Sequence, residues 1–430
     1  MTQAFDSIRQ GLNEAIAHAR LNVVIDRNPN ANMSKPSPLP PAPLLLLHAT
    51  AGAGHTRAAQ AIAAALREQP QAPAHALIDT LDCTSTLYRN LYTQTYIELV
   101  QRAPELWGYL YERADTVRHS GSSKRVRARL ALDQLNSPSF RRLLDEVQPQ
   151  AIACTHFLPL SLLSDLKRKG ELSQPVHAVI TDISPHAFWI HPHIDHYHVA
   201  SDAAARELSR KGVDTRCIHV TGIPVDPVFA HSTPAPQARA ALGLPERPTV
   251  LLMSGGFGIG PLVAMLDSFA GADCGLMSLV VVAGRNAELA QACRERAAKL
   301  ALPVEVLGFV NNIHQYMDAA DLIVTKPGGL TTTEILAKGK PMALVAPIPG
   351  QEQRNCEYLL EEGAAVRLHD VADTAWYLQR WLGDAERMAS MQASARRIAR
   401  PHAARDIAQA LQVSLPQACG STDLQKSTSI

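Results

Sequence analysis

The sequence predicts an α/β protein built from two Rossmann-like, doubly wound domains that face a cleft. Its 430 residues exceed the roughly 100–200 residues of one ordinary domain, so two domains are expected. Short runs of Val, Ile and Leu with little polar alternation lie between helical stretches, as is typical of parallel strands covered on both faces. The order strand, glycine loop, helix also occurs twice, starting near residues 44 and 249. Sheets of this kind bind ligands at their carboxyl ends.

The first predicted domain covers residues 44–228. It opens with the apolar strand LLLLH, the glycine turn AGAG and an Ala-rich helix. Further strands are expected at 75–80, 151–155, 177–183, 196–201 and 217–222. Helical stretches separate these runs, as a doubly wound parallel sheet requires.

The second predicted domain covers residues 229–390 and starts with a linker, 231–248, that contains four Pro. The strand and helix order then begins again with TVLLMSGGFG at residue 249. Its further strands are expected in SLVVVAG, VEVLGF, DLIVTKPGG and PMALVAP. Two such domains joined by a Pro-rich linker predict a ligand cleft between them.

The two ends of the chain are predicted to lie outside these domains. Residues 1–43 are rich in Pro, Asn and Ser near their end and are expected to form a disordered extension, with Met33 as a possible true start. Residues 391–430 are expected to form a helix that can cross back to the first domain, followed by a frayed tail.

Composition excludes several classes of function. Lys and Arg number 41 against 40 Asp and Glu, so a formal charge of +1 gives no support for a nucleic-acid partner. The seven Cys are scattered without metal-ligand spacing, which predicts a reduced protein without a zinc site. The sequence contains no run of about 18 apolar residues, so no membrane-spanning helix is predicted. Its N-terminus does not have the pattern of a signal peptide. We therefore expect the protein on the cytosolic side.

The first candidate motif is Gly52-Ala53-Gly54-His55, where the first strand meets its helix. Backbone N–H groups at a helix start can bind an anion, and glycines let it approach closely. The dinucleotide fingerprint is incomplete, because Arg57 stands where its third glycine would be. His55 is either a base at the mouth of the cleft or a residue that caps the helix, and spacing leaves both open.

The second motif, TDISPHAFW at 181–189, follows a predicted strand of the first domain. Asp182 and His186 lie four residues apart and can share a proton transfer or orient a hydroxyl. The alternative is a capping Asp beside surface histidines. The loop is rich in His but lacks a defined ligand set, so no metal is predicted.

Two glycine motifs mark the second domain. Ser254, Gly255 and Gly256 can hold a diphosphate with their backbone amides, or form only a structural turn. The motif TKPGGLTTTE at 325–334 places a glycine turn and a helix after a strand. Glu334 stands one turn inside that helix, where its carboxylate can accept both hydroxyls of a ribose.

The last motif is PGQEQRN at 349–355. Gln351, Glu352 and Asn355 are polar side chains that can hydrogen bond the hydroxyls of a sugar. Packing alone does not explain such a polar cluster in a loop.

Taken together, five segments resemble the diacylglycerol glucosyl- and galactosyltransferases, the glycolipid synthases of bacteria and plastids. They are GAGH, TDISPHAFW, HVTGIPVDPVF, TKPGGLTTTE and PGQEQRN, in this order and spacing. That family, which includes the monogalactosyldiacylglycerol synthases, is related to the peptidoglycan N-acetylglucosaminyl transferase and shares its GT-B fold. The similarity covers roughly residues 44–370.

The resemblance implies a role for each motif. Glu334 would bind the ribose of UDP, and the backbone at Phe309 and Val310 would contact the uracil. The diphosphate would lie against Gly54, Ser254, Gly255, Gly256, Gly328, Gly329, Leu330 and Thr331. The donor sugar would be held by Gln351, Glu352 and Asn355. His55 would lie near the reacting centre, with Asp182 and His186 on the acceptor side, and the resemblance leaves the base open between His55 and Asp182.

The implied activity is transfer of a hexose from a UDP-sugar to diacylglycerol or a glycosylated diacylglycerol, in one displacement with inversion. UDP is the leaving group of the UDP-sugar co-substrate, and helix N-termini can stabilise its negative charge. Neither a metal nor another cofactor is therefore expected. The sequence does not decide between glucose and galactose, the number of sugars added, or the oligomeric state.

A lipid acceptor also implies contact with a membrane surface. Five of the nine Tyr lie in segment 88–111. Residues 116–132, which directly follow Asp115, contain five basic residues and no acidic one. Aromatic residues beside a basic run suit an anionic headgroup surface. The alternative is an aromatic stripe in the core beside a solvated helix. With the resemblance, we expect a peripheral enzyme on the cytoplasmic side of the cell membrane.

Three other functions remain possible at this stage. An enzyme of the same fold can act on another lipid-linked acceptor, and a UDP-sugar epimerase is a more distant enzymatic alternative. A nucleotide-sugar-binding regulator without turnover is the alternative from a different class. UDP release that depends on added diacylglycerol separates the preferred function from all three.

Overall fold

The structure, a computed structural model, describes residues 43–50, 53–69, 72–84, 89, 103–116, 137–255, 258, 260–271 and 277–415. Predictions that concern Met33, Gly52, Gly256, the basic run at 116–132 beyond Thr116 and the tail after residue 415 lie outside these residues. The same holds for most of segment 88–111 before residue 103.

The first sheet has six parallel strands in the order β2-β1-β3-β4-β5-β6. Its strands are β1 (Leu44–His48), β2 (His75–Asp79), β3 (Ala151–Cys154), β4 (Val176–Val179), β5 (His196–Val199) and β6 (Ile218–Val220). Every residue of β1, β3 and β4 is buried, which explains why these runs lack polar alternation.

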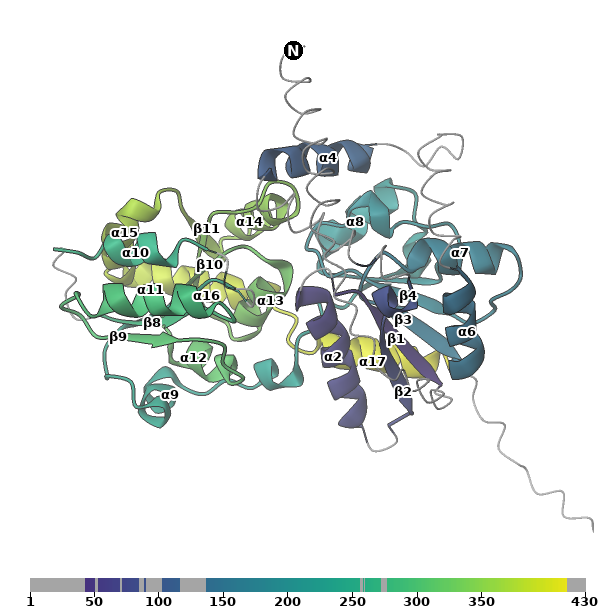
Figure 1. Ribbon diagram of the computed structural model, residues 1–430, viewed down its shortest axis with the longest axis horizontal. Coiled ribbons are helices and arrows are strands. Elements are labelled where there is room, and N and C mark those ends of the chain that lie inside the picture. The colour runs from purple at the N-terminus through teal and green to yellow at the C-terminus, as the bar shows by residue number, and fades with distance from the viewer. Residues whose placement is uncertain are drawn as a thin grey trace, which may run out of the picture.

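The second sheet also has six parallel strands, in the order β12-β11-β10-β7-β8-β9. Its strands are β7 (Thr249–Met253), β8 (Ser278–Val282), β9 (Val304–Leu307), β10 (Leu322–Thr325), β11 (Met342–Val345) and β12 (Ala365–Leu368). The two sheets with their helices form the predicted GT-B arrangement of two Rossmann-like domains (Figure 1). The fold class is confirmed.

Helices cover the faces of both sheets. Those that begin before residue 230 are α2 (Ala53–Arg67), α4 (Pro104–Thr116), α6 (Ser137–Val147), α7 (Leu160–Arg168) and α8 (Asp202–Arg210). Those after it are α9 (Ala235–Leu242), α10 (Leu262–Asp267), α11 (Ala287–Ala297), α12 (Ile313–Ala319), α13 (Gly329–Ala337), α14 (Gln351–Glu361), α15 (Thr374–Leu382), α16 (Ala385–Ile398) and α17 (Ala403–Val413). Short 3-10 helices are η1 (Thr80–Cys83), η2 (Ala187–Trp189), η3 (Thr215–Cys217), η4 (Pro227–Ala230) and η5 (Val371–Asp373).

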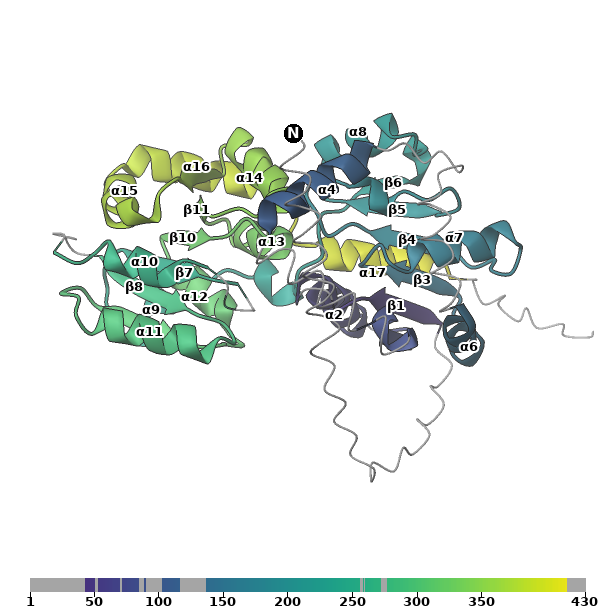
Figure 2. The ribbon, with the colours of Figure 1, turned by 45° about the horizontal axis from the view of Figure 1, so that its top comes forward.

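The last helix, α17, lies on the first sheet although it follows the second domain in sequence (Figure 2). It packs against α2, and its buried Ala404, Ile407 and Leu411 join the core beneath β1 and β3. Beyond its end, the Ser414 hydroxyl lies 3.0 Å from Nε2 of His177. The chain thus connects the two domains twice.

Four histidines on neighbouring strands stack on one another within the first sheet. His177 on β4 stands beside His196 and His198 on β5, and His219 on β6 follows in register. Ring nitrogens pair between His177 and His198 at 3.1 Å and between His196 and His219 at 3.1 Å. Burial lowers the pKa of all four, so they are neutral and structural. This stack accounts for part of the His-rich sequence.

Candidate functional site

The two domains meet where the loops after β4 and β10 approach each other. Gly329 opens α13, and a Cβ at that position would lie only 2.5 Å from the backbone oxygen of Thr181. A glycine is therefore required there by the close approach of the two domains. Helix α13 also contacts α2, whose first turn carries His55. Most of the predicted site residues are collected around this junction.

His55 is partly buried and is held by the first sheet. Its Nδ1 lies 2.9 Å from the backbone oxygen of Thr155 and 2.8 Å from the hydroxyl of Thr181. A carbonyl oxygen can only accept, so this contact assigns the ring proton to Nδ1 and leaves the lone pair on Nε2. Burial, opposed by the Thr155 hydrogen bond, lowers the pKa of His55 to about 4. At neutral pH His55 is therefore an uncharged hydrogen-bond acceptor and a weak base.

Asp182 follows β4 and is buried, with 6% of the residue exposed. One carboxylate oxygen accepts a hydrogen bond from the indole of Trp189 at 3.2 Å, and the other accepts from the side-chain amide of Gln351 in the second domain. Burial raises the pKa of Asp182 to about 7. A carboxyl group with this pKa can take a proton near neutral pH and release it again.

His186 occupies a different position from Asp182. Its Nε2 donates to the backbone oxygen of Tyr111 at 2.9 Å, and its Nδ1 accepts from the backbone N–H of Phe188 at 3.1 Å. Both ring nitrogens are thus used inside the protein, where His186 caps η2. The sequence placed it beside Asp182 in proton transfer, whereas the geometry gives it the task of joining η2 to α4.

Glu334 lies in α13 and is 2% exposed. Its carboxylate forms an ion pair of 2.6 Å with the guanidinium of Arg57, which comes from α2 in the first domain. Burial, opposed by the charge of Arg57, raises the pKa of Glu334 to about 7. A small cavity lies beside this pair, and it is lined by Arg57, Gln60, Val225, Asp226, Leu330 and Glu334. A ribose that binds Glu334 would have to replace or share the contact with Arg57.

The start of α13 is available to an anion. Gly328 caps this helix without a side-chain hydrogen bond, so the first N–H groups, from Gly329 to Thr331, have no intrahelical partner. The hydroxyls of Thr332 and Thr333 bond back to carbonyl oxygens of the preceding turn and do not compete for these N–H groups. A helix N-terminus of this kind can hold a diphosphate.

The remaining residues assigned to the nucleotide lie on other loops of the second sheet. Ser254 is buried and its hydroxyl donates to the oxygen of Val282 at 3.3 Å, while Gly255 has a positive φ of 74° that favours glycine. Phe309 is half-exposed, and the guanidinium of Arg285 lies 4.6 Å from its ring centroid. The next residue, Val310, packs against the core of the domain.

The loop at 349–355 contributes its three predicted side chains in different ways. Gln351 reaches Asp182, and Glu352 lies 3.4 Å from the ammonium of Lys326. Asn355 is 1% exposed: its oxygen accepts from the N–H of Ile183 at 3.3 Å, and its nitrogen donates to the oxygen of Pro327 at 3.0 Å. Asn355 therefore joins the two domains in this structure, a role that the sequence did not suggest.

Helix α4 spans the same junction from the outside, above α14 and α8 in Figure 1. Arg354 on α14 binds Glu112 at 2.7 Å and Asp115 at 2.8 Å, so α4 is tied to the second domain. Although burial alone would raise it, hydrogen bonds from Lys211 and Arg354 hold the pKa of Asp115 at about 2. This network was missed, because its members are ordinary charged residues far apart in the sequence.

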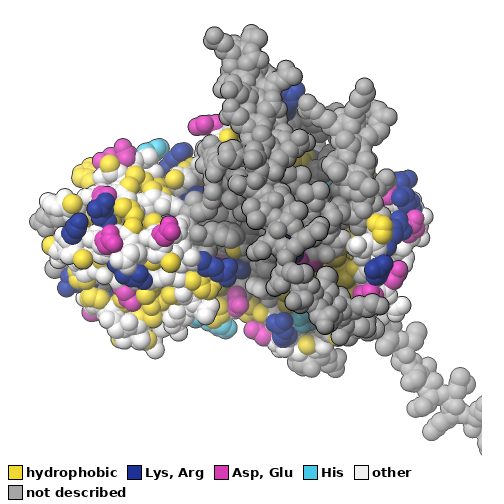
Figure 3. Space-filling model, in the orientation of Figure 1, with side chains coloured by type: hydrophobic (Ala, Val, Ile, Leu, Met, Phe, Trp, Pro, Cys, Tyr) yellow, Lys and Arg dark blue, Asp and Glu magenta, His cyan; other side chains and the backbone are white. Residues whose placement is uncertain are grey.

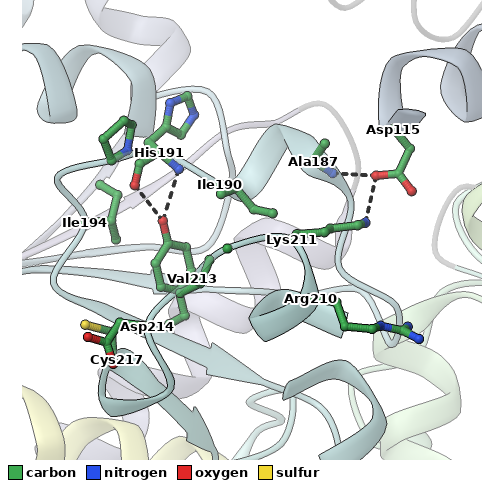
Figure 4. Close-up of a pocket in the computed structure, with 13 residues that line it drawn as sticks. Asp115, Ala187, Ile190, His191, Ile194, Arg210, Lys211, Val213, Asp214 and Cys217 are labelled. Atoms are coloured by element: carbon green, nitrogen blue, oxygen red, sulfur yellow. Dashed lines mark hydrogen bonds and ion pairs between the residues drawn. The ribbon is translucent and has the colours of Figure 1, made fainter. Parts of the chain in front are cut away.

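Asp115 also anchors η2 to α8 (Figure 4). Its carboxylate accepts hydrogen bonds of 2.8 Å from the N–H of Ala187 and from the ammonium of Lys211. These contacts line one side of a cavity of about 780 Å³ in the first domain, whose other walls include Ile190, Ile194 and Val213. The network fixes η2 and, through it, the indole that orients Asp182.

Neither a metal site nor a spanning helix is found in the described part of the chain. There, no three His, Cys, Asp or Glu side chains gather as a metal-binding group. Within the same residues, no helix is long and apolar enough to cross a membrane.

Both halves of the chain resemble known protein families. Residues 55–225 match the family model for monogalactosyldiacylglycerol synthase, and residues 250–411 match the C-terminal domain of glycosyltransferase family 28. The chloroplastic monogalactosyldiacylglycerol synthase of Spinacia oleracea is 32% identical over 81% of this chain and 68% of the spinach protein. The chain belongs to this glycosyltransferase family. The resemblance seen in its motifs is thus confirmed.

Bacterial members of the family are similarly related. A processive diacylglycerol β-glucosyltransferase of Bacillus pumilus is 31% identical over 61% of this chain and 70% of its own length. The corresponding Bacillus subtilis protein is 33% identical over 52% of this chain, and the match spans only 58% of that relative. The matches thus span 58% to 70% of these bacterial relatives' own lengths.

Solved structures show the same fold. MurG of Acinetobacter baumannii superposes with a TM-score of 0.57 at 16% identity, covering 87% of this chain and all of that protein. A UDP-GlcNAc 2-epimerase of Neisseria meningitidis gives 0.54 at 12% identity, covering 86% of this chain and 99% of its own. At such identities these likenesses establish the architecture alone. They do not separate a transferase from an epimerase.

Proposed function

We propose that the protein transfers a hexose, glucose or galactose, from a UDP-sugar to diacylglycerol or a glycosylated diacylglycerol, with inversion at the anomeric carbon. One observation carries the proposal. Asp182, a buried carboxyl with a pKa of about 7, faces the 349–355 loop across the domain junction, beside the anion-binding start of α13. The names of two family relatives, a diacylglycerol β-glucosyltransferase and a monogalactosyldiacylglycerol synthase, support the transferred sugar and the acceptor.

The donor half of the reaction uses the second domain. Glu334 accepts the ribose hydroxyls, the Phe309 and Val310 loop contacts the uracil, and the N–H groups from Gly329 onward receive the diphosphate. The loop at Ser254 and Gly255, with Gly256 beyond the described residues, and Gly54 on the opposite wall complete this site. As the bond between the anomeric carbon and UDP breaks, the helix N-terminus stabilises the charge that develops on the leaving phosphate.

The acceptor half uses the first domain, with Asp182 as the base. Its carboxylate takes the proton of the acceptor hydroxyl while that oxygen attacks the anomeric carbon. Asp182 suits this step better than His55, because its pKa is about 7 and that of His55 is about 4. We assign to Nε2 of His55 a hydrogen bond from a substrate hydroxyl, and to His186 the orientation of η2.

Gln351 is the side chain that competes with the acceptor. It donates to one oxygen of Asp182 in this structure, and the acceptor hydroxyl reaches that oxygen more freely when the amide turns away. A donor hexose in the 349–355 loop supplies hydroxyls that the same amide can bind. Donor binding would then free the base, which links the order of binding to catalysis. Glu352 and Lys326 border the same loop.

The reaction is proposed to need no metal or other cofactor, since backbone N–H groups can stabilise UDP. Activity that survives EDTA and is unchanged by added Mg²⁺ would support this, and activity restored only by a divalent cation would contradict it.

The enzyme is further proposed to work at the cytoplasmic face of the membrane. On α4, Tyr109 is 53% exposed and Leu110 is 43% exposed, while the basic run follows this helix in sequence. An exposed aromatic and apolar face suits an interface. Over the visible face of the second domain, basic and acidic side chains are interspersed (Figure 3), without a basic field for nucleic acid. Sedimentation with anionic liposomes that is unaffected by neutralising Arg125, Arg127 and Arg129 would contradict the membrane role.

The deciding experiment is a lipid profile. Expression in a host that lacks glycolipids, followed by mass spectrometry, should reveal hexosyl-diacylglycerol and show how many sugars are added. Purified protein should release UDP only when diacylglycerol is supplied. UDP-sugar binding without any lipid product would favour a regulator, and a changed sugar without transfer would favour an epimerase.

A further inference from the structure

Tyr111, on α4, is a buried residue whose hydroxyl has no hydrogen-bond partner among the described residues. Only 6% of Tyr111 is exposed. Buried polar groups in native proteins are nearly always paired, because an unpaired one loses its hydration without compensation. An unpaired buried hydroxyl beside a candidate reaction centre is therefore available to bind a substrate.

The surroundings of Tyr111 place it beside the proposed base. Its ring packs against Gly350, where a Cβ would come within 3.0 Å of the ring, and the next residue, Gln351, binds Asp182. Its ring centroid also lies 4.1 Å from that of His186, four residues after Asp182. Tyr111 therefore contacts both chain segments that meet at the carboxylate of Asp182, one from each domain.

The state of the hydroxyl follows from the same surroundings. Burial, with a further contribution from the charge of Asp182, raises the pKa of Tyr111 well above 10. The hydroxyl is protonated at neutral pH and can donate a hydrogen bond. An acceptor hydroxyl that gives its own proton to Asp182 has lone pairs on its oxygen to receive that bond.

We propose that the Tyr111 hydroxyl binds the oxygen of the acceptor hydroxyl that Asp182 deprotonates. The inference rests on the proposed function. One lone pair of that oxygen accepts from Tyr111, which aims the other at the anomeric carbon while its proton passes to Asp182. Helix α4 is held from both domains, by Lys211 of the first and by Arg354 of the second, so the hydroxyl has a fixed place at the junction.

Another tyrosine of the same domain provides a matched contrast. Tyr197 is 2% exposed, and its hydroxyl donates to the oxygen of His191 at 2.9 Å and accepts from the N–H of the same residue at 3.1 Å. The hydroxyl of Tyr197 is structural, because protein groups use it fully. Removing the hydroxyl from each tyrosine in turn should therefore have opposite consequences.

The experiment compares Tyr111→Phe with Tyr197→Phe in the full chain. For Tyr111→Phe we expect an unchanged or raised melting temperature and a fall of about 10- to 100-fold in kcat/KM for diacylglycerol. Its KM for the UDP-sugar and its ratio of glucose to galactose transfer should remain those of the wild type. For Tyr197→Phe we expect a lower melting temperature with kcat/KM unchanged for the folded enzyme.

Three outcomes would overturn the inference. A Tyr111→Phe enzyme with a lower melting temperature and normal kcat/KM would show a structural hydroxyl. One with an altered sugar preference and normal kinetics for diacylglycerol would show that Tyr111 contacts the donor. Failure of the wild-type protein to glycosylate diacylglycerol would overturn the proposed function itself, and the inference with it.

Discussion

Replacing Asp182 with Asn should strongly reduce transfer and also stabilise the protein at alkaline pH. Burial raises the pKa of Asp182 from 3.8 to about 7, whereas in the unfolded chain the pKa is ordinary. Between these pH values the folded state binds the proton more tightly, so this residue's contribution to stability falls as the pH rises through that window. Above pH 7 the whole difference amounts to about 4 kcal/mol of unfolding free energy.

The Asn side chain can keep the contacts of the carboxylate. Its oxygen can accept from the indole of Trp189, and its nitrogen can donate to Gln351 once that amide turns over. The variant thus loses the buried charge and the base while the hydrogen bonds remain. In urea denaturation at about pH 8, we expect a gain in unfolding free energy of up to about 4 kcal/mol, which disappears toward about pH 4.

Kinetics test the other half of the prediction. With the donor saturating, the wild-type kcat/KM for diacylglycerol should rise with pH and reach half its plateau at about pH 7, because Asp182 must be ionised before the acceptor binds productively. The Asp182→Asn enzyme should lose a factor of about 100 to 10,000 in kcat. Glu334 also has a pKa of about 7. Measuring at saturating donor prevents the titration of Glu334 from affecting this pH profile.

Asp165, on α7, provides a control, because its pKa is shifted in the direction opposite to that of Asp182. At Asp165 the effect of burial is outweighed by hydrogen bonds from Lys169 and Arg168, so its pKa is lowered. Asp165→Asn should lose a little stability above pH 4, with activity unchanged. A wild-type kcat/KM for diacylglycerol that is flat between about pH 5 and pH 9, or an Asp182→Asn protein no more stable at pH 8, would refute the reasoning.

Three further predictions concern the donor side and the domain junction. His55→Ala should abolish transfer yet leave UDP affinity, measured by calorimetry, largely intact; near-normal turnover would overturn its assignment. Glu334→Gln should raise the KM for UDP-sugar about tenfold with a smaller change in kcat, because one acceptor of the ribose hydroxyls is lost; an unchanged KM would contradict this. Gly329→Ala should increase the radius of gyration in solution scattering, since its Cβ would meet Thr181 at 2.5 Å, whereas Gly328→Ala meets nothing within 4 Å and should keep the shape.

Much of the fold could be predicted because parallel strands buried on both faces leave a plain trace in the sequence. The run at 44–48 is wholly apolar except for its last residue, and the structure buries all of it. Strand β12 (Ala365–Leu368) was not predicted. It lies at the edge of its sheet and two of its four residues are only half-buried, so its apolar signal is weak.

The residue types of the candidate site could be predicted from the sequence. The contacts that these residues make between the domains could not. Asn355 and His186 were assigned to substrates, yet their polar atoms bond to protein. Those of Asn355 bond to Ile183 and Pro327, and those of His186 to the backbone of α4 and of η2. Tyr111 belonged to an aromatic stretch expected at the membrane, but the structure buries it two positions after exposed Tyr109. Such assignments depend on which chain segments meet across the junction, and local spacing does not contain that information.

The junction between the domains holds two buried carboxyl groups, and each has a partner from the opposite domain. Asp182 of the first domain is met by Gln351, and Glu334 of the second is met by Arg57. A buried carboxylate without a partner is costly, so closure without substrates is tolerated only because these side chains occupy the two oxygen sites. Substrate hydroxyls compete for the same oxygens. Under the proposed function, donor and acceptor hydroxyls would replace these partners at the junction, so both substrates would compete with contacts that hold the two domains together.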